Sequence, residues 1–351
     1  PRGAWLRACE RALRATSNEA LDYGDHRGRI ELRSQLSSYL ARVRGVRSSP
    51  DRMVVTQGFT QALDLLCRVF VRRGTVTMAF ESPSLAEEWA TVRASGLRIE
   101  PVPVDRRGLM TDQLDGVTAG AIVVTPAHQF PTGAVMAPDR RTALMAWASR
   151  HDRIVVEDDY DAEFRYDRQA VGALQGLDPD RVVHIGTASK TLAPGVRLGW
   201  MSLPADLVDD IRDAKAAADS GSPAVDQLAL AELIASGGYD RQIARARHVY
   251  RKRRDRLMAA LAGRLPGLRV EGAAAGLHVL LRLPDDADDQ AVARMAADSG
   301  IGVRALSAMS LTGVPDRGLV LGYGRLPDGG IDDGVAALAA CLMDEGIAVA
   351  R

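Results

Sequence analysis

Apolar residues in the first part of the chain alternate between short β-branched runs and longer stretches with helical spacing. In 60–70 and 138–149 the apolar residues recur every three or four positions, the pattern of a helix with one buried face. The runs that predict strands are 53–56, 75–80, 97–104, 121–126 and 154–159. Alternation of this kind predicts a mostly parallel sheet with helices on both faces.

The pattern changes after Leu203. Three helices are predicted there, followed by two strands and two more helices, an α+β arrangement. We therefore expect an α/β fold with a large and a small domain. The predicted parts are N-terminal helices at 1–44 that belong to the small domain, a large α/β domain at 45–205, connecting helices at 206–240 and a small α+β domain at 241–351.

The arginine-rich run RQIARARHVYRKRRDR at 241–256 allows two interpretations, a nucleic-acid-binding patch or one solvated face of a helix. We favour the helix face, because Ile243, Val249 and Leu257 are spaced so that they can face a core.

Composition excludes several function classes. The 351 residues include 45 basic and 45 acidic ones, so no global charge favours nucleic acid or an acidic membrane. Cys9, Cys67 and Cys341 lie far apart, which indicates neither a disulfide framework nor a zinc site and fits a reducing compartment. No apolar run approaches the roughly 18–20 residues of a membrane span. We expect a cytoplasmic protein without a membrane segment.

Lys190 is the first candidate for chemistry. Two apolar runs, 182–185 and 198–203, flank a small polar loop that carries it, which predicts strand, loop and strand. Only three of the 45 basic residues are lysines. An amine can lose its proton and attack a carbonyl, whereas a guanidinium cannot. The alternative is an ordinary surface lysine.

A cluster of carboxylates supports the chemical interpretation. The predicted strand at 154–159 leads into Glu157, Asp158, Asp159 and Asp161, with Tyr160 among them. A parallel strand that ends in acids places them where open α/β sheets bind ligands. A nucleophilic lysine and an acid that can hold a protonated pyridine are the groups that pyridoxal 5′-phosphate (PLP) chemistry requires.

The chain resembles the fold-type I PLP enzymes of the aspartate aminotransferase superfamily. It most closely resembles the aminotransferase-like domain of MocR/GabR-type transcription regulators of the GntR family. Five motifs carry the resemblance: YGDHRG at 23–28, TQGFTQAL at 56–63, TPAHQFPTG at 125–133, EDDYDAEF at 157–164 and GTASKTLAPGVRLG at 186–199. The resemblance implies a large domain with a mostly parallel, seven-stranded sheet and a smaller α+β domain.

The resemblance also assigns catalytic roles. Lys190 would form an internal aldimine with PLP and move the proton during catalysis. Asp158 would hold the pyridine nitrogen, and Tyr160 would reach the phenolic oxygen. Glu157 and Asp159 should face the other side of the strand. A slip of one position would exchange the roles of Asp158 and Asp159.

Residue types and family spacing together predict the phosphate site. A glycine that opens a helix after a strand offers N–H groups to an anion, and hydroxyls and a guanidinium can add to them. The predicted ligands are Gly58, Phe59, Thr60, Thr187, Ser189 and Arg197. Fold-type I sites are usually completed across a homodimer, so Tyr23 is expected to reach the phosphate of a partner subunit.

Two positions depart from the family pattern. Phe130 stands where aminotransferases place the asparagine that binds the phenolic oxygen, so His128 or Gln129 is a candidate replacement. A metal role for His128 is not expected, because no second ligand lies at helical spacing. Leu85 replaces the aromatic residue that stacks on the ring, so PLP should stay bound but turnover should be slow.

The arginine expected for a substrate carboxylate would fall near Val320. Arg325 and Arg304 are the candidates that remain.

The leading functional hypothesis is an effector-sensing domain that binds PLP and forms an external aldimine with an amino acid or other small amine. Such a domain would contact DNA only through a helix-turn-helix domain, expected before Pro1 and not in this chain. The alternative is a free-standing PLP-dependent aminotransferase. A third interpretation, the fold without a cofactor, is opposed by the presence of Lys190 and Asp158.

Overall fold

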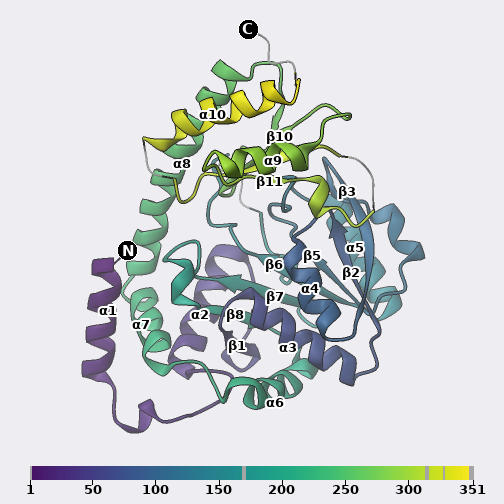
Figure 1. Cartoon of the computed structure of the whole chain (residues 1–351). Helices are drawn as coiled ribbons and strands as arrows, with labels where there is room; N and C mark the ends of the chain where they lie inside the picture. Colours follow the sequence, from purple (N-terminus) through teal and green to yellow (C-terminus); the bar gives the residue numbers. More distant parts are fainter. Residues whose placement is uncertain (1, 168–170, 313–315, 327–328, 348–351) are drawn as a thin grey trace.

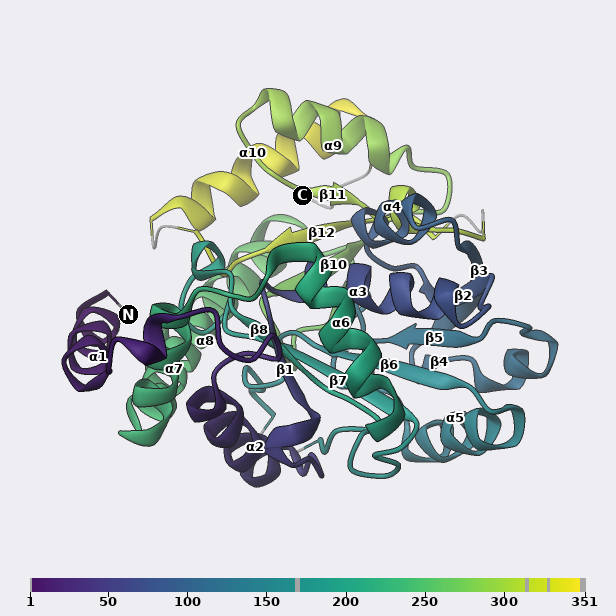
Figure 2. The same cartoon turned by 90° about the horizontal axis from the view of Figure 1, so that it is seen from below.

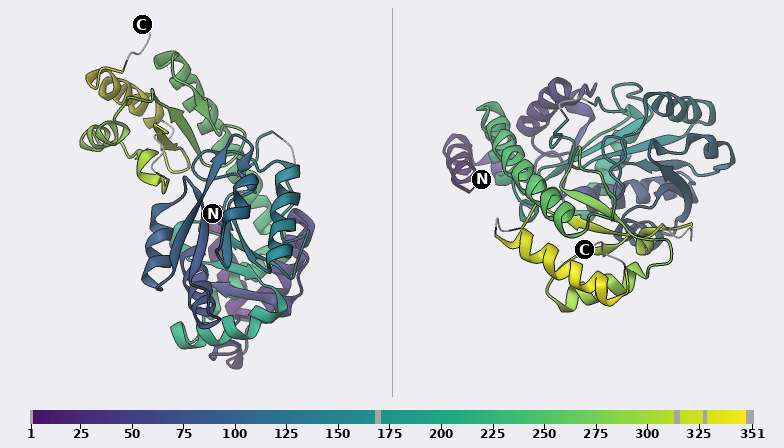
Figure 3. Two further views of the ribbon diagram at one scale, coloured as in Figure 1. Left: turned by 90° about the vertical axis from the view of Figure 1, so that its right-hand side faces the viewer. Right: turned by 90° about the horizontal axis from the view of Figure 1, so that it is seen from above.

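The computed structural model describes residues 2–167, 171–312, 316–326 and 329–347. A large α/β part forms one end of the molecule, and the yellow-green C-terminal part lies at the other end (Figures 1 and 3). The fold class predicted from the sequence is therefore observed. None of the described helices is both long enough and apolar enough to cross a membrane.

An eight-stranded sheet forms the centre of the large part, in the order β1-β8-β7-β6-β5-β2-β3-β4. Strands β3, β2, β5, β6 and β7 run parallel, whereas β8 is antiparallel to both β7 and β1. The strands are β1 (Met53–Thr56), β2 (Thr77–Ser82), β3 (Arg98–Asp105), β4 (Gly108–Leu109), β5 (Ala121–Val124), β6 (Ile154–Asp159), β7 (Val182–Thr187) and β8 (Gly199–Ser202).

The predicted count of seven strands differs from the observed sheet by the short strand β4. This strand returns antiparallel to the end of β3, with Val104 opposite Leu109 and Asp105 opposite Gly108. Gly108 has φ +88°, and a Cβ there would lie 2.8 Å from the Cα of Met136. A two-residue strand has no hydrophobic period that a sequence pattern can reveal.

Helices cover both faces of the sheet (Figure 2). On one face, Phe80, Val123 and Val156 pack in a common cluster with α3 (Phe59–Arg72), α4 (Ala86–Ala94) and α6 (Val208–Asp219). On the other face, Ile122 and Val155 pack against α5 (Pro138–His151). Successive residues of each strand therefore enter different cores, as expected for side chains that alternate along a strand.

The N-terminal helices α1 (Arg2–Ala15) and α2 (Ile30–Arg44) lie against strands of the large sheet, and their predicted assignment to the small domain stays a prediction. They share a buried cluster with β1, β8 and α7 (Ala224–Ala235). The amphipathic pattern identified these helices correctly, but it says only that one face is buried and not which surface buries it.

The C-terminal part is a four-stranded antiparallel sheet in the order β11-β12-β10-β9, packed with helices around a separate apolar cluster. Two of its strands have two residues each and were not predicted. Its elements are β9 (Val270–Glu271), β10 (His278–Arg282), α9 (Asp289–Asp298), β11 (Arg304–Ala305), β12 (Gly318–Gly322) and α10 (Gly330–Asp344).

The long helix α8 (Gly238–Arg264) connects the two parts (Figure 1). Ile243 and Leu257 on this helix are buried, as predicted, but Val249 is 37% exposed. Several arginines of the run bind the protein itself: Arg247 donates to the carbonyl oxygen of Glu163, and Arg254 lies 4.5 Å from the ring centre of Tyr166. The run is therefore a helix, but only part of its basic face is solvated.

We expect the buried ion pair between Arg44 and Asp159 to contribute strongly to stability. The guanidinium donates to both carboxylate oxygens, at 2.7 and 3.1 Å, and both side chains are at most 6% exposed. Arg44→Met should lower the free energy of unfolding, measured in urea, by about 3–5 kcal/mol, because it leaves a buried carboxylate unpaired. Arg42→Met, which removes the exposed pair with Asp240, should cost at most about 1 kcal/mol. Equal losses would contradict this assignment.

Candidate functional site

A cavity of about 710 Å³ lies at the carboxyl ends of β2, β5 and β6 and is closed by residues of the small domain. Most residues that the sequence analysis selected line it: Phe59, Thr60, Leu85, Asp158, Tyr160, Thr187, Ser189, Lys190, Arg197, Arg304 and Arg325. Gly58, His128 and Tyr23 do not line it. The structure therefore brings together residues from most of the chain's length at the sheet edge that the strand directions predict.

Lys190 sits in the loop between the antiparallel strands β7 and β8. Within this loop Thr187 donates to the Ser189 hydroxyl at 2.9 Å, and the carbonyl oxygen of Lys190 accepts a hydrogen bond from Tyr250 on α8 at 3.0 Å. Lys215, by contrast, is fully buried and bonded to Asp219 at 2.7 Å. Of these two amines, only that of Lys190 faces the cavity.

Alternation along β6 decides which carboxylate enters the cavity. Asp158 shares the strand face of Val156 and lines the cavity. Its neighbours turn to the opposite face, where Glu157 accepts from the backbone N–H of Leu174 at 2.7 Å and Asp159 pairs with Arg44. The register proposed from the sequence is the observed one.

The Asp158 carboxylate lacks a direct partner, and only the nearby charge of Lys190 opposes the effect of its burial. Among the described residues none forms a hydrogen bond or an ion pair with its side chain, although it is only 8% exposed. Burial, followed by the nearby carboxylate of Glu88, raises its pKa well above the usual range. A cation in the cavity next to Asp158 would remove this penalty, and the protonated pyridine nitrogen of PLP is such a cation.

The start of α3 forms an anion cradle. Gly58 caps this helix with φ +90°, and a Cβ there would lie 3.1 Å from Nη2 of Arg197. No side chain caps the first N–H groups of the helix, whose residues Phe59 and Thr60 line the cavity. Free N–H groups at a helix start, an adjacent guanidinium and the Ser189 hydroxyl fit a phosphate group.

The loop 125–133 provides no direct replacement for the missing asparagine. Phe130 lines the cavity, whereas the Gln129 amide turns away and donates to the carbonyl oxygens of Pro83 at 2.8 Å and Phe130 at 2.7 Å. His128 does not line the cavity, but its Nδ1 lies 3.1 Å from the hydroxyl of Tyr160, which does.

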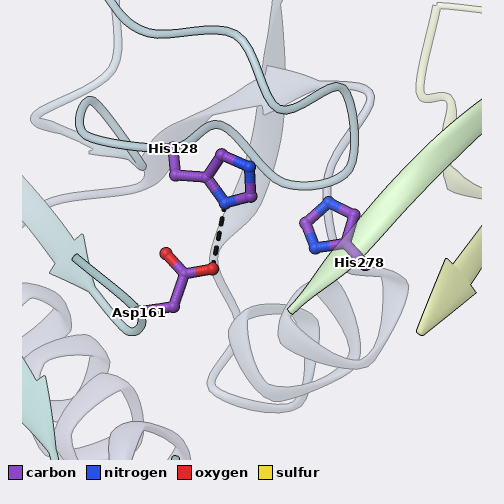
Figure 4. A group of neighbouring side chains, drawn as sticks. All are labelled: His128, Asp161 and His278. Carbon is purple, nitrogen blue, oxygen red and sulfur yellow. Dashed lines mark hydrogen bonds and ion pairs between the residues drawn. The ribbon is translucent and has the colours of Figure 1, made fainter. Parts of the chain in front are cut away.

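His128, Asp161 and His278 form a buried group whose nitrogen and oxygen atoms lie within 4.8 Å of one another (Figure 4). The sequence pattern does not reveal this group, because it joins β10 to two loops more than a hundred residues away. Hydrogen bonds already engage it: His128 Nδ1 lies 2.9 Å from Asp161 Oδ2, and His278 Nε2 lies 3.1 Å from the carbonyl oxygen of Pro131. The expectation of no metal stays a prediction.

Two further cavity acids were also missed. Glu81 is the second-last residue of β2, and its Oε2 accepts from the Thr125 hydroxyl at 2.6 Å, whereas its Oε1 has no partner among the described residues. Burial raises the pKa of Glu81 to about 7, and burial together with Glu81 raises that of Glu88 to about 8. An acid at the end of a buried strand, the signal that selected Asp158, could also have found Glu81.

The two candidate arginines differ in their partners. Arg304 is engaged by Glu87, with 2.7 Å between Nη1 and Oε1. Arg325 lines the cavity and forms no ion pair with any described residue. Its guanidinium is therefore the freer of the two to bind a carboxylate.

Comparisons with known proteins agree with this site. The family described as aminotransferase class I and II matches residues 3–318. The "Uncharacterized HTH-type transcriptional regulator YhdI" of Bacillus subtilis is 33% identical over 96% of this chain and 72% of its own length. The "Probable rhizopine catabolism regulatory protein MocR" of Rhizobium meliloti is 29% identical over 98% of this chain and 70% of its own length.

Among solved structures, an archaeal alanine:glyoxylate aminotransferase superposes with a TM-score of 0.90 at 28% identity, covering 98% of this chain and 87% of that one. The chain belongs to the aminotransferase class I and II family. Its sequence relatives include MocR-type regulators, so the resemblance inferred from the motifs is confirmed.

The buried carboxylate of Asp158 predicts an unusual stability effect. A carboxyl whose pKa is raised by folding opposes the folded state as pH rises above its unfolded value near 3.9. Asp158→Asn should therefore stabilise the cofactor-free protein, and urea midpoints should show a larger gain at pH 8 than at pH 5. Asp159→Asn should have the opposite sign, because it weakens the pair with Arg44. Destabilisation by Asp158→Asn at pH 8 would contradict the assignment.

Proposed function

We propose that this chain is the effector-binding domain of a cytoplasmic MocR-type transcription regulator, which holds PLP on Lys190 and binds an amino acid or other small amine. The observation that carries the proposal is that Lys190 and the buried carboxylate of Asp158 line one cavity, beside a helix start whose N–H groups no side chain caps. The regulators among the relatives support the cellular role.

Each group has a defined task in this proposal. Arg197 and the N–H groups at the start of α3 bind the phosphate, and Asp158 stabilises the proton on the pyridine nitrogen. Lys190 attaches the cofactor covalently, and the Tyr160 hydroxyl donates to the phenolic oxygen. Bound PLP supplies an electron-accepting ring that reacts with amines.

Leu85 favours binding over rapid turnover. It lines the cavity at the start of α4, where the family pattern has an aromatic ring. Loss of stacking costs only about 0.5–1.5 kcal/mol beyond the buried area, too little to release a cofactor held by a covalent bond and a phosphate clamp. A sensor needs different ligand affinities in two conformations and does not need fast chemistry.

We further propose a homodimer. Tyr23 is 80% exposed and does not line the cavity of its own chain. In the proposed dimer, its loop reaches the phosphate site of the partner subunit.

The second candidate function is a free-standing aminotransferase. Lys190, Asp158, Tyr160 and Arg197 all line the cavity and would serve transamination equally well. Steady turnover at ordinary enzyme rates, ~1–10³ per second, with an amino acid and a keto acid would establish this alternative. We expect amines to change the absorbance of the loaded protein with slow or undetectable turnover.

Covalent attachment of the cofactor can be tested directly. Borohydride treatment of the PLP-loaded protein should bleach its visible band, and peptide mass analysis should place the adduct on Lys190. Lys190→Arg should abolish the band. Lys252, exposed on α8, is the internal control for non-specific labelling. An adduct found mainly on Lys252 would contradict the proposal.

Arg325 should recognise the carboxylate of an amino-acid effector. Arg325→Gln should raise the dissociation constant for such an effector roughly tenfold to a hundredfold, because a hydrogen bond to a charged group contributes about 1.5–3 kcal/mol. The amine that lacks the carboxylate should bind both proteins equally. Arg304→Gln should have a smaller effect, since Glu87 already engages that guanidinium. The reverse order would identify Arg304 as the anchor.

A further inference from the structure

The Tyr160 hydroxyl belongs to a hydrogen-bonded chain that continues away from the cavity. His128 Nδ1 lies 3.1 Å from this hydroxyl and 2.9 Å from Asp161 Oδ2. The hydroxyl itself donates to the backbone carbonyl oxygen of His128 at 3.1 Å. The side chains of His128 and Asp161 are at most 2% exposed, so water does not compete for these bonds.

The surroundings fix the position of the His128 ring. Gly276 has φ +76°, and a Cβ there would lie 2.1 Å from His128 Cε1 and 2.5 Å from Asp161 Oδ2. On the other side a Cβ at Gly133 would lie 3.2 Å from His128 Nε2. Two glycine backbones therefore enclose the imidazole, and a side chain at Gly276 would displace it.

The hydrogen-bond partners define the tautomer of His128. An ionised carboxylate only accepts hydrogen bonds, so the nitrogen that faces Asp161 carries the proton. Nε2 has no partner among the described residues and is buried, which disfavours a second proton that would need an acceptor. The proton on Nδ1 can therefore be accepted by both Asp161 and the Tyr160 oxygen.

In this structure the Tyr160 O–H donates to the His128 carbonyl oxygen, and an acceptor in the cavity, such as the phenolic oxygen of PLP, would compete for the same proton. Because the phenol oxygen accepts from His128, its own O–H is the group that must donate. Burial and the carboxylates of Asp161 and Asp158 raise the pKa of Tyr160, so the phenol keeps its proton. The other titratable groups near the ring are Glu81 from β2, Lys190 and the neutral His278 from β10.

We propose that His128 and Asp161 are positioning residues that orient the Tyr160 hydroxyl toward the phenolic oxygen of bound PLP. This inference rests on the proposed function, because it assigns the polar contact that the asparagine makes in ordinary aminotransferases to a relay behind the tyrosine. A metal at the same three residues would require His128 Nδ1 to lose its proton, which the contact with Asp161 opposes.

A pH titration of the visible band of PLP-loaded protein tests the relay. A donor to the phenolic oxygen makes the proton of the Lys190–cofactor linkage easier to remove. His128→Phe should weaken that donor and raise the midpoint by about 0.5–1 pH unit, the shift that corresponds to one hydrogen bond. His128→Asn, whose amide can donate from the Nδ1 position, should restore most of the wild-type value.

The double variant separates the relay from general packing. In a Tyr160→Phe background, His128→Phe should cause no additional shift, because its effect passes through the hydroxyl. Tyr166→Phe is the matched control: it removes a buried phenol that donates to the carbonyl oxygen of Gly276 at 2.8 Å and does not line the cavity, and the midpoint should stay unchanged. Additive shifts, or no shift in His128→Phe, would overturn the relay.

A second measurement needs no cofactor. Nitrogen-15 NMR of the full wild-type chain should show the Nδ1–H tautomer of His128, and the Nε2–H tautomer would overturn the proposal even if His128→Phe fails to fold. If the wild-type chain forms no visible band with PLP, the proposed function itself fails and the relay fails with it. A normal band with an unshifted midpoint in His128→Phe rejects the relay alone.

Discussion

The position of β6 is the constraint on which the site depends. Its three consecutive carboxylates are separated by strand alternation: Glu157 and Asp159 are neutralised on one face, and Asp158 is delivered to the other without a partner. The bidentate pair with Arg44 therefore has two effects. It ties α2 to the sheet, and it fixes the register that turns Asp158 toward the cavity, because a shift of one residue would exchange every side chain between the two faces.

An unpaired buried carboxylate destabilises a fold, so its presence at a cavity indicates a ligand that compensates it. The same reasoning applies to the start of α3. Its uncapped N–H groups and the Arg197 guanidinium, all positive, lie close together without an anionic partner among the described residues. The cavity therefore lacks a cation beside Asp158 at one end and an anion beside Arg197 at the other. A phosphorylated pyridine supplies both within one molecule, which is the physical reason the family resemblance and the structure agree.

Sequence patterns identified much of this arrangement and failed for definable reasons. The strands 53–56 and 154–159 were predicted with their observed bounds, since buried β-branched runs leave a clear period. The two-residue strands β4, β9 and β11 are too short to show a hydrophobic period. Lys190 and Asp158 follow apolar runs that are recognisable in the local sequence. His128, Asp161 and His278, by contrast, meet only through the tertiary fold. The burial of α1 and α2 was predictable, but the surface that they cover was not.

The composition of the cavity wall bears on how a sensor could work. Glu81, Asp158 and Lys190 come from the large part, and His278, Val320 and Arg325 from the small one. An effector that contacts both parts binds with an affinity that depends on their relative position, and such a dependence is what allows a ligand to shift a conformational equilibrium. Helix α8 adds a connection between the two, because Tyr250 on it holds the Lys190 carbonyl and Arg253 binds that of Gly324. Under the proposed function, chemistry at Lys190 and movement of the small domain are therefore mechanically linked, and fast turnover would weaken the signal by consuming the ligand.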